Sequence, residues 1–297
     1  GTNTPPFVMI YNTATNYYDT LANPATSVQG KGYSIKTAVA NPAVSFSGVP
    51  NNGPISIALS TAGDKYNLVG NPYPSNLDLT KFLTTNAGNI GSTLWFWDYT
   101  GGSVTSQTGN TASNFGYATF NAAGSGTFVK APNGTNVPAN GAKHAKVGQG
   151  FIVEAVGASV TFNNDQRAAV VGVVLNKGTT ANQNEGKYWL TLTTSYNANV
   201  TQAITYQDGA SNDFDSYDSQ AIGLGSDAFY SLAGAEKVVI QGKALFNTAD
   251  VVALGNKHFE AGNFKIELTQ KEGLFADGQA IYLKDKLLGT EKHAYSL

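Results

Sequence analysis

Hydrophobic and polar residues alternate, or form short apolar runs, along almost the whole chain. Segments that contain such runs of four to eight residues stand at 42–49, 54–60, 65–70, 93–99, 148–156 and 158–164, and Gly, Asn or Pro closes each of them. The pattern resumes later at 187–194, 199–208, 236–243, 263–269 and 279–285. Alternation with a period of two predicts half-buried strands. Short strands closed by turn residues at this spacing are typical of a β-sandwich. We therefore predict an all-β protein.

Two β-sandwich modules in tandem, of Ig-like or jelly-roll-like type, account for this arrangement. The first is expected at 1–168 and the second at 187–297. Between them, residues 169–186 begin apolar and end in a polar stretch rich in Gly and Asn, which is typical of a linker. The Gly-, Ser-, Thr- and Asn-rich tract at 100–126 is expected to be a long surface loop of the first module.

Helix signals are scarce. The stretch "LDLTKFLTTNAG" (77–88) predicts one short helix, with Asp78 as its N-cap and Phe82 and Leu83 in its first turns.

Composition favours a protein that works outside the cell. Hydrophobic residues make up 41% of the 297 residues, which is enough for a packed core, but charged residues make up only 13%. Neutral polar groups must therefore cover the surface, as is common in extracellular β-proteins. There is no Cys, which excludes disulfides and thiolate chemistry, and a single Met leaves little to oxidise. The net charge of −2 and the lack of a basic stripe argue against nucleic acid as a partner. No apolar run is long enough to span a membrane.

Eight stretches in order carry a resemblance to a known group of proteins. They are "YNLVGNPYPSNLDL" (66–79), "LWFWDY" (94–99), "GQGFIVEA" (148–155), "VTFNNDQR" (160–167), "YWLTLT" (188–193), "ITYQDGASNDFDSYDS" (204–219), "VVIQGKALFNTADVVALG" (238–255) and "GLFADGQAIYLKDKLLGT" (273–290). The series resembles the region ahead of the C-terminal sorting signal in large surface and secreted proteins of Bacteroidota that the type IX secretion system exports.

This resemblance covers roughly residues 30–297 and implies an export route, although the sorting signal itself does not occur in these residues. In such proteins further strands usually precede the stretch matching 7–21 and follow the stretch matching 283–297. We therefore expect the chain to be a segment of a longer secreted polypeptide.

The stretch "LVGNPYPSNLDL" (68–79) raises the question of a binding loop. Proline fixes φ and cannot donate to a strand ladder, so the strand must end near Gly70 and continue as a stiff extended loop. Tyr73 in this loop either packs back on the sandwich or faces a ligand. The resemblance favours packing, because the motif recurs ahead of unrelated functional regions.

An aromatic strand at 93–99 is a candidate carbohydrate site. Trp95, Trp97 and Tyr99 are spaced two apart and so share one face of the strand. They form either a flat platform for sugar rings or part of a core between sheets.

The Asp-rich stretch "QDGASNDFDSYDS" is a candidate calcium site. Asp208, Asp213, Asp215 and Asp218 supply oxygens of the kind that Ca²⁺ prefers, with Asn212 nearby and Asp250 as a further candidate. The spacing is not that of an EF-hand. Alternatively, the same side chains accept hydrogen bonds from turn amides in an acidic loop.

No catalytic residues are assigned, and we do not expect an enzyme. His144, His258 and His293 are scattered without metal-ligand spacing, and no nucleophile elbow, P-loop or H-E-x-x-H motif occurs. The "DTL" triplet at 19–21 resembles an O-glycosylation signal of Bacteroidota, which makes Thr20 a candidate modification site.

The predicted function is that of an extracellular structural or adhesive module at the outer cell surface, with other surface proteins, polysaccharide or copies of itself as partners. Filament formation by donation of the apolar strand at 7–10 is one form that self-assembly could take. The alternative is a non-catalytic carbohydrate-binding accessory region of a secreted enzyme.

Overall fold

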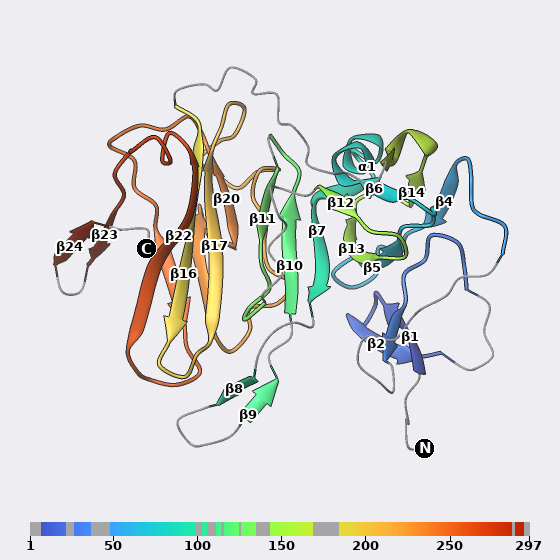
Figure 1. Cartoon of the computed structure of the whole chain (residues 1–297), viewed down its shortest axis with the longest axis horizontal. Coiled ribbons are helices and arrows are strands. Elements are labelled where there is room, and N and C mark those ends of the chain that lie inside the picture. The colour runs from blue at the N-terminus through green and yellow to red at the C-terminus, as the bar shows by residue number, and fades with distance from the viewer. Residues whose placement is uncertain are drawn as a thin grey trace. The chain divides into compact units, whose positions relative to one another are not determined.

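The computed structural model describes residues 7–21, 27–36, 48–98, 103–105, 111–113, 116–124, 126–134, 143–168, 184–286 and 289–293. These residues are nearly all in strands and turns, which confirms the predicted all-β class (Figure 1). The chain divides into two compact units. Unit 1 comprises residues 1–96 and 142–174, and unit 2 comprises residues 97–141 and 175–297.

Small antiparallel sheets make up the described part of unit 1. β13 (Gly150–Ala155) lies between β5 (Tyr66–Gly70) and β7 (Ile90–Asp98), and β1 (Phe7–Asn12) lies between β2 (Tyr17–Thr20) and β3 (Ser34–Lys36). The other strands are β4 (Ile55–Ala58) paired with β14 (Ser159–Phe162), and β6 (Asn76–Asp78) between β12 (His144–Ala145) and β15 (Arg167–Ala168). A 3₁₀ turn, η2, spans Asn164–Gln166.

The predicted helix is present as α1 (Leu79–Thr85). Asp78 is its N-cap, as predicted, because Oδ1 accepts hydrogen bonds from the amides of Thr80 and Lys81, both at 3.0 Å. Phe82 on α1 packs against Phe151 and Phe162, with ring centroids 5.3 and 5.0 Å apart. The helix therefore covers the core of unit 1.

Unit 2 is built on a four-stranded sheet of order β20-β17-β16-β22. Its strands are β16 (Gly186–Thr194), β17 (Asn199–Tyr206), β20 (Ile240–Lys243) and β22 (Phe264–Gly273), with β17 and β20 parallel. A second sheet contains β18 (Ala228–Ala233) between β19 (Glu236–Val238) and β21 (Leu254–Lys257). Three hairpins complete the described strands: β8 (Ser103–Thr105) with β9 (Thr111–Ser113), β10 (Gly116–Asn121) with β11 (Thr127–Val129), and β23 (Tyr282–Asp285) with β24 (Thr290–His293).

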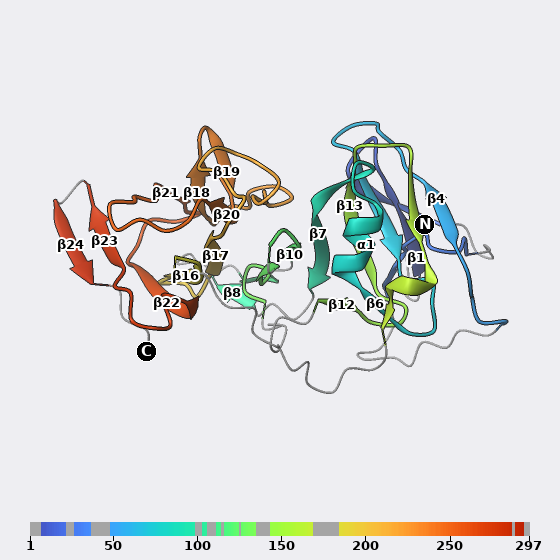
Figure 2. The same cartoon turned by 90° about the horizontal axis from the view of Figure 1, so that it is seen from above.

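Both faces of β16 and β17 are buried. Alternate residues such as Leu190 and Ile204 form a core with Phe229 of β18, and Figure 2 shows β18, β19 and β21 as a layer on that side. On the opposite face Trp189 packs with Val129 of β11 in a second cluster, and its Nε1 donates to the carbonyl of the residue before Val129, at 2.7 Å. Several of the buried positions are polar, among them Thr191, Thr201 and Gln202, so the sequence of these strands alternates and does not show that both faces are buried.

The division into units differs at one place from the modules expected from sequence. Residues 97–141, expected in the first module, group with unit 2, because β11 packs on β17 and β20. A second observation concerns strand donation by residues 7–10. β1 is the middle strand of its sheet and pairs with β2 and β3 of its own chain, so both of its edges carry partners. In this structure β1 is therefore a paired strand of its own sheet, and strand donation to another copy stays a prediction.

Candidate functional site

The Asp-rich loop (residues 208–218) uses its carboxylates to bind turn amides. Asp215 accepts hydrogen bonds from the amide of Ser211 at 2.8 Å through Oδ2 and from the amide of Tyr217 at 2.7 Å through Oδ1. Asp208 accepts from the amide of the residue that follows it, at 3.1 Å. This is the second of the two arrangements that the sequence left open.

Asp218 fastens this loop to the edge of the central sheet of unit 2. Its side chain is 3% exposed; Oδ1 accepts from the amide of Gly242 on β20 at 3.0 Å, and Oδ2 from the amide of Asp215 at 2.8 Å. The amide of Ser219 donates to the carbonyl of Ile240 at 2.8 Å. Because β20 is an edge strand of its sheet, these bonds cover backbone groups that would otherwise be open to pairing with another chain.

Two further residues hold the loop in place. A Cβ at Gly242 would lie 2.3 Å from the Cβ of Tyr217, so only glycine lets the loop approach β20 this closely. Asn121 at the end of β10 is 2% exposed, and its Nδ2 donates to the carbonyls of Ser216 and Asp218 at 3.1 and 3.0 Å. The loop is therefore bound from both sides within unit 2.

Two of the four predicted calcium ligands, Asp215 and Asp218, use their carboxylate oxygens to bind the loop itself, and the calcium site stays a prediction. Ca²⁺ needs six to eight oxygens around one point, whereas both carboxylate oxygens of Asp215 and of Asp218 face backbone amides. In the part of the chain that the structure describes, no group of three or more His, Cys, Asp or Glu residues is placed to hold a metal ion. Burial also raises the pKa of Asp218 to about 6, which disfavours the charged form.

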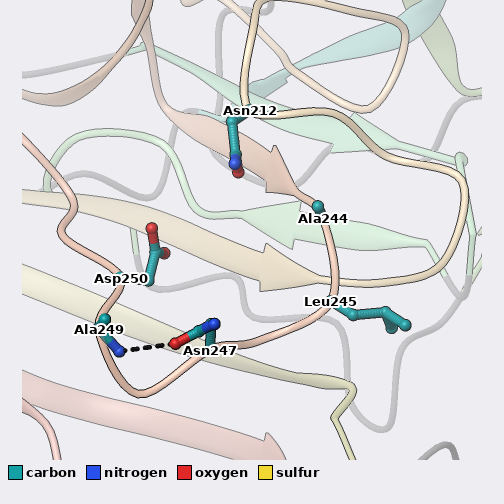
Figure 3. Close-up of a pocket in the computed structure, with 6 residues that line it drawn as sticks. All are labelled: Asn212, Ala244, Leu245, Asn247, Ala249 and Asp250. Carbon is teal, nitrogen blue, oxygen red and sulfur yellow. Dashed lines mark hydrogen bonds between the residues drawn. The ribbon is translucent and has the colours of Figure 1, made fainter.

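A shallow hollow lies beside this loop (Figure 3). We call it the Asp250 hollow; its volume is about 280 Å³, and it is lined by Asn212, Ala244, Leu245, Asn247, Ala249 and Asp250. The hydroxyl of Tyr206 donates to Oδ2 of Asp250 at 2.7 Å, and the buried ammonium of Lys243 lies 3.3 Å from Oδ1. Burial and the neighbouring Tyr188 raise the pKa of Tyr206, so the hydroxyl remains a donor. Asp250 is thus held in place and its charge is balanced.

A second hollow uses the same chain segment. We call it the Asp277 hollow; its volume is about 430 Å³, and it is lined by Asn184, Phe246, Thr248, Leu274, Asp277 and Gln279. Residues of the segment 244–250 alternate between the two hollows: 245, 247 and 249 line the first, and 246 and 248 line the second. This segment is the wall that the hollows share.

Of the aromatic residues predicted to form a platform, Trp95 lies in the core and Trp97 lies at the surface. Trp95 is 3% exposed and packs edge-on against Tyr66, with ring centroids 5.2 Å apart, so it cannot present a face to a sugar. Trp97 is 51% exposed and packs edge-on against Tyr117 of β10 at 5.1 Å. Tyr99 lies outside the described residues. The structure therefore corrects the three-residue platform and leaves Trp97, beside Tyr117, as its exposed member.

Tyr73 packs back on unit 1 and does not face a ligand. It is 1% exposed, and its hydroxyl donates to the carbonyl of Gly53 at 2.7 Å. Its amide donates to Oδ1 of Asn71 at 3.1 Å, and the guanidinium of Arg167 lies 5.5 Å from the ring centroid. The two prolines thus position a structural tyrosine.

One cluster of titratable groups was not anticipated from the sequence. Tyr196 donates through its hydroxyl to the carboxylate of Asp227, and the Nδ1 atom of His258 lies 4.0 Å from the same carboxylate. His258 stacks on Phe264 with ring centroids 3.6 Å apart, and burial lowers its pKa. These residues are far apart in the sequence, so no spacing signal could have joined them. Thr20, the candidate glycosylation site, is exposed on β2.

Comparison with known proteins gives one match. A family model described as a domain of unknown function, DUF8693, matches residues 2–294. The chain belongs to the DUF8693 family. No curated protein and no solved structure matches this DUF8693 chain. Within its described residues, no helix is long and apolar enough to cross a membrane.

Proposed function

We propose that this DUF8693 chain is a structural and adhesive module of a larger secreted protein of Bacteroidota, exported by the type IX secretion system and displayed on the outer cell surface. The observation that carries the proposal is the use of the Asp-rich loop. Its carboxylates, the densest group of acidic residues in the sequence, bind backbone amides and fasten the loop to a sheet edge. The residues with the most conspicuous chemistry therefore build structure.

The surface composition supports a place outside the cell. Only 13% of the residues are charged and none is Cys, so stability rests on core packing and on polar contacts between neutral groups. The export route is proposed from the resemblance to regions that precede type IX sorting signals.

Adhesion to other surface proteins is favoured over strand pairing between copies. β22 is the other edge strand of its sheet, and its pairing with β16 is irregular between Trp189 and Leu190. Lys265 and Glu267 form an ion pair of 2.6 Å on this strand. Charges and irregular pairing both discourage the addition of a strand from another chain.

The complete reading frame of the parent gene tests this proposal. We expect an export signal at its start and a type IX sorting signal at its end, with surface repeats between them. A reading frame that joins this chain to a cytosolic enzyme without export signals would refute the proposal.

A second candidate, a non-catalytic carbohydrate-binding accessory region, is favoured by the exposed indole of Trp97 beside Tyr117. A hydrolase domain in the same reading frame would support it. Trp97→Ala is then expected to abolish retention on polysaccharide while the protein stays folded, and unchanged retention would exclude Trp97 as the platform.

A further inference from the structure

We infer that the Asp250 and Asp277 hollows together bind a neutral glycan, with one sugar residue in each and the segment 244–250 between them. This goes beyond the proposed structural role and supplies a ligand class for adhesion. It does not depend on the export route or on Trp97.

The two hollows share one set of chemical groups. Each contains a single carboxylate, Asp250 or Asp277, and each contains side-chain amides and apolar carbon. A carboxylate accepts hydrogen bonds from hydroxyl groups, and an amide both donates and accepts. The amides are Asn212 and Asn247 in the first hollow and Asn184 and Gln279 in the second, and the apolar contacts come from Leu245 in the first and from Phe246 and Leu274 in the second. A few polar groups on apolar walls suit a polyhydroxylated ring.

The charges that line the two hollows favour a neutral ligand over an anionic one. Among the described residues that line the hollows, none is Lys or Arg, and the ammonium of Lys243 is buried against Asp250. An anionic sugar would meet a carboxylate in each hollow without a cation to bind it. A metal ion would find one carboxylate in each hollow, where it needs several oxygens.

The wall between the hollows is fixed before any ligand arrives. Phe246 packs on the core of unit 2, with its ring centroid 5.2 Å from that of Tyr206. The amide of Ala249 donates to Oδ1 of Asn247 at 2.9 Å, which closes a turn in the segment (Figure 3). Tyr206 holds Asp250 in place at the end of the segment. Groups held in this way lose little entropy on binding, which favours affinity from a small site.

Figure 3 also shows that the first hollow has walls from two separate loops. Asn212 projects from the Asp-rich loop toward the space above Asp250. The fastening of that loop by Asp218 therefore positions one wall of the hollow.

The test fills each hollow without removing a contact. Ala249 and Thr248 are exposed, so Ala249→Tyr blocks the Asp250 hollow and Thr248→Tyr blocks the Asp277 hollow at little cost to the fold. Ala235→Tyr, in the exposed turn between β18 and β19, is the matched control. The probes are laminarin, mannan and arabinogalactan as neutral polysaccharides, and polygalacturonate and heparin as anionic ones, each cast into native gels. Thermal melts check that every variant is folded.

We expect at least one neutral polysaccharide to retard residues 1–297, and neither anionic one to do so. Each filling variant should weaken binding by about tenfold or more, a loss of about 1.4 kcal/mol or more, while Ala235→Tyr binds as the unchanged protein does. Retardation by no neutral polysaccharide, or retardation that both filling variants leave intact, would overturn the inference. Loss of binding with Trp97→Ala alone would also overturn it and would assign the glycan to the aromatic pair. These measurements use purified protein and do not depend on export. A negative result would therefore refute the glycan site without counting against the proposed surface display.

Discussion

Asp218→Ala is the substitution that most directly tests how the Asp-rich loop is held. The side chain is 3% exposed and accepts hydrogen bonds from the amides of Asp215 and Gly242. Truncation removes both acceptors and keeps the backbone unchanged. The loop should then separate from the edge of β20.

The magnitude follows from the two amides that lose their acceptor. A buried donor without a partner costs about 1–3 kcal/mol. The amide of Asp215 lies in a half-buried part of the loop and can reach water, whereas the amide of Gly242 is buried. We therefore expect Asp218→Ala to lower the free energy of unfolding of unit 2 by about 1–3 kcal/mol, most of it from the amide of Gly242.

Two measurements report this loss. Urea unfolding gives the free energy of unfolding, and hydrogen exchange of the peptide that contains β20 gives the local opening at Gly242. A change of 2 kcal/mol raises the exchange of the Gly242 amide by about 25-fold or more. Asp213→Asn is the matched control, because Asp213 is exposed in the same loop and should change stability by less than about 0.5 kcal/mol. Equal effects of the two substitutions would show that Asp218 does not fasten the loop.

The pH dependence of Asp218 has a definite sign. Burial raises its pKa to about 6, above the ordinary value of 3.8, so the folded protein binds the proton more tightly than the unfolded chain between these values. Its contribution to the free energy of unfolding is full below about pH 4 and falls as the pH rises through 6. The wild-type protein should therefore lose stability relative to Asp218→Asn between pH 4.5 and pH 7, and a gain would contradict the assignment.

Three other perturbations separate structural from binding roles. Gln202 is 0% exposed on β17, and neither end of its amide has a hydrogen-bond partner among the described residues. Gln202→Leu should therefore raise the free energy of unfolding by about 1–3 kcal/mol. A lower free energy of unfolding in urea would show that a bound partner holds the amide. Trp95→Ala should lower the free energy of unfolding by about 3–5 kcal/mol in the same assay, as for other core aromatics. Trp97→Ala should lower it by less than about 1 kcal/mol, because that ring is half exposed. Equal losses would refute the assignment of Trp95 to the core and Trp97 to the surface. The melting temperature should be the same in excess Ca²⁺ and in chelator, and a rise with Ca²⁺ would support the calcium site.

The strands and the helix could be predicted because their signals are local. Alternation along 187–194 marks β16, and Asp78 before an apolar turn marks the start of α1. The prolines at 72 and 74 mark the end of β5. In each case the residues that decide the structure are neighbours in the sequence.

The site could not be predicted in the same way, because contacts between distant residues decide it. Trp95 and Trp97 share one strand face, yet Tyr66 helps to bury the first while the second remains half exposed. Asp250 was only a candidate cation ligand in the sequence, and its pairing with Lys243 and Tyr206 changes it into a fixed hydrogen-bond acceptor. Which segments come together is set by the sheet order, which the alternation does not encode.

Protease treatment of intact cells tests surface display most directly. An antibody against residues 1–297 follows the parent protein in wild-type cells and in a strain that lacks type IX secretion. If the chain is an exported surface module, protease added outside removes the signal from intact wild-type cells, and the secretion mutant keeps a protected, periplasmic form. A signal that resists external protease in intact wild-type cells, and disappears only after lysis, would contradict surface display.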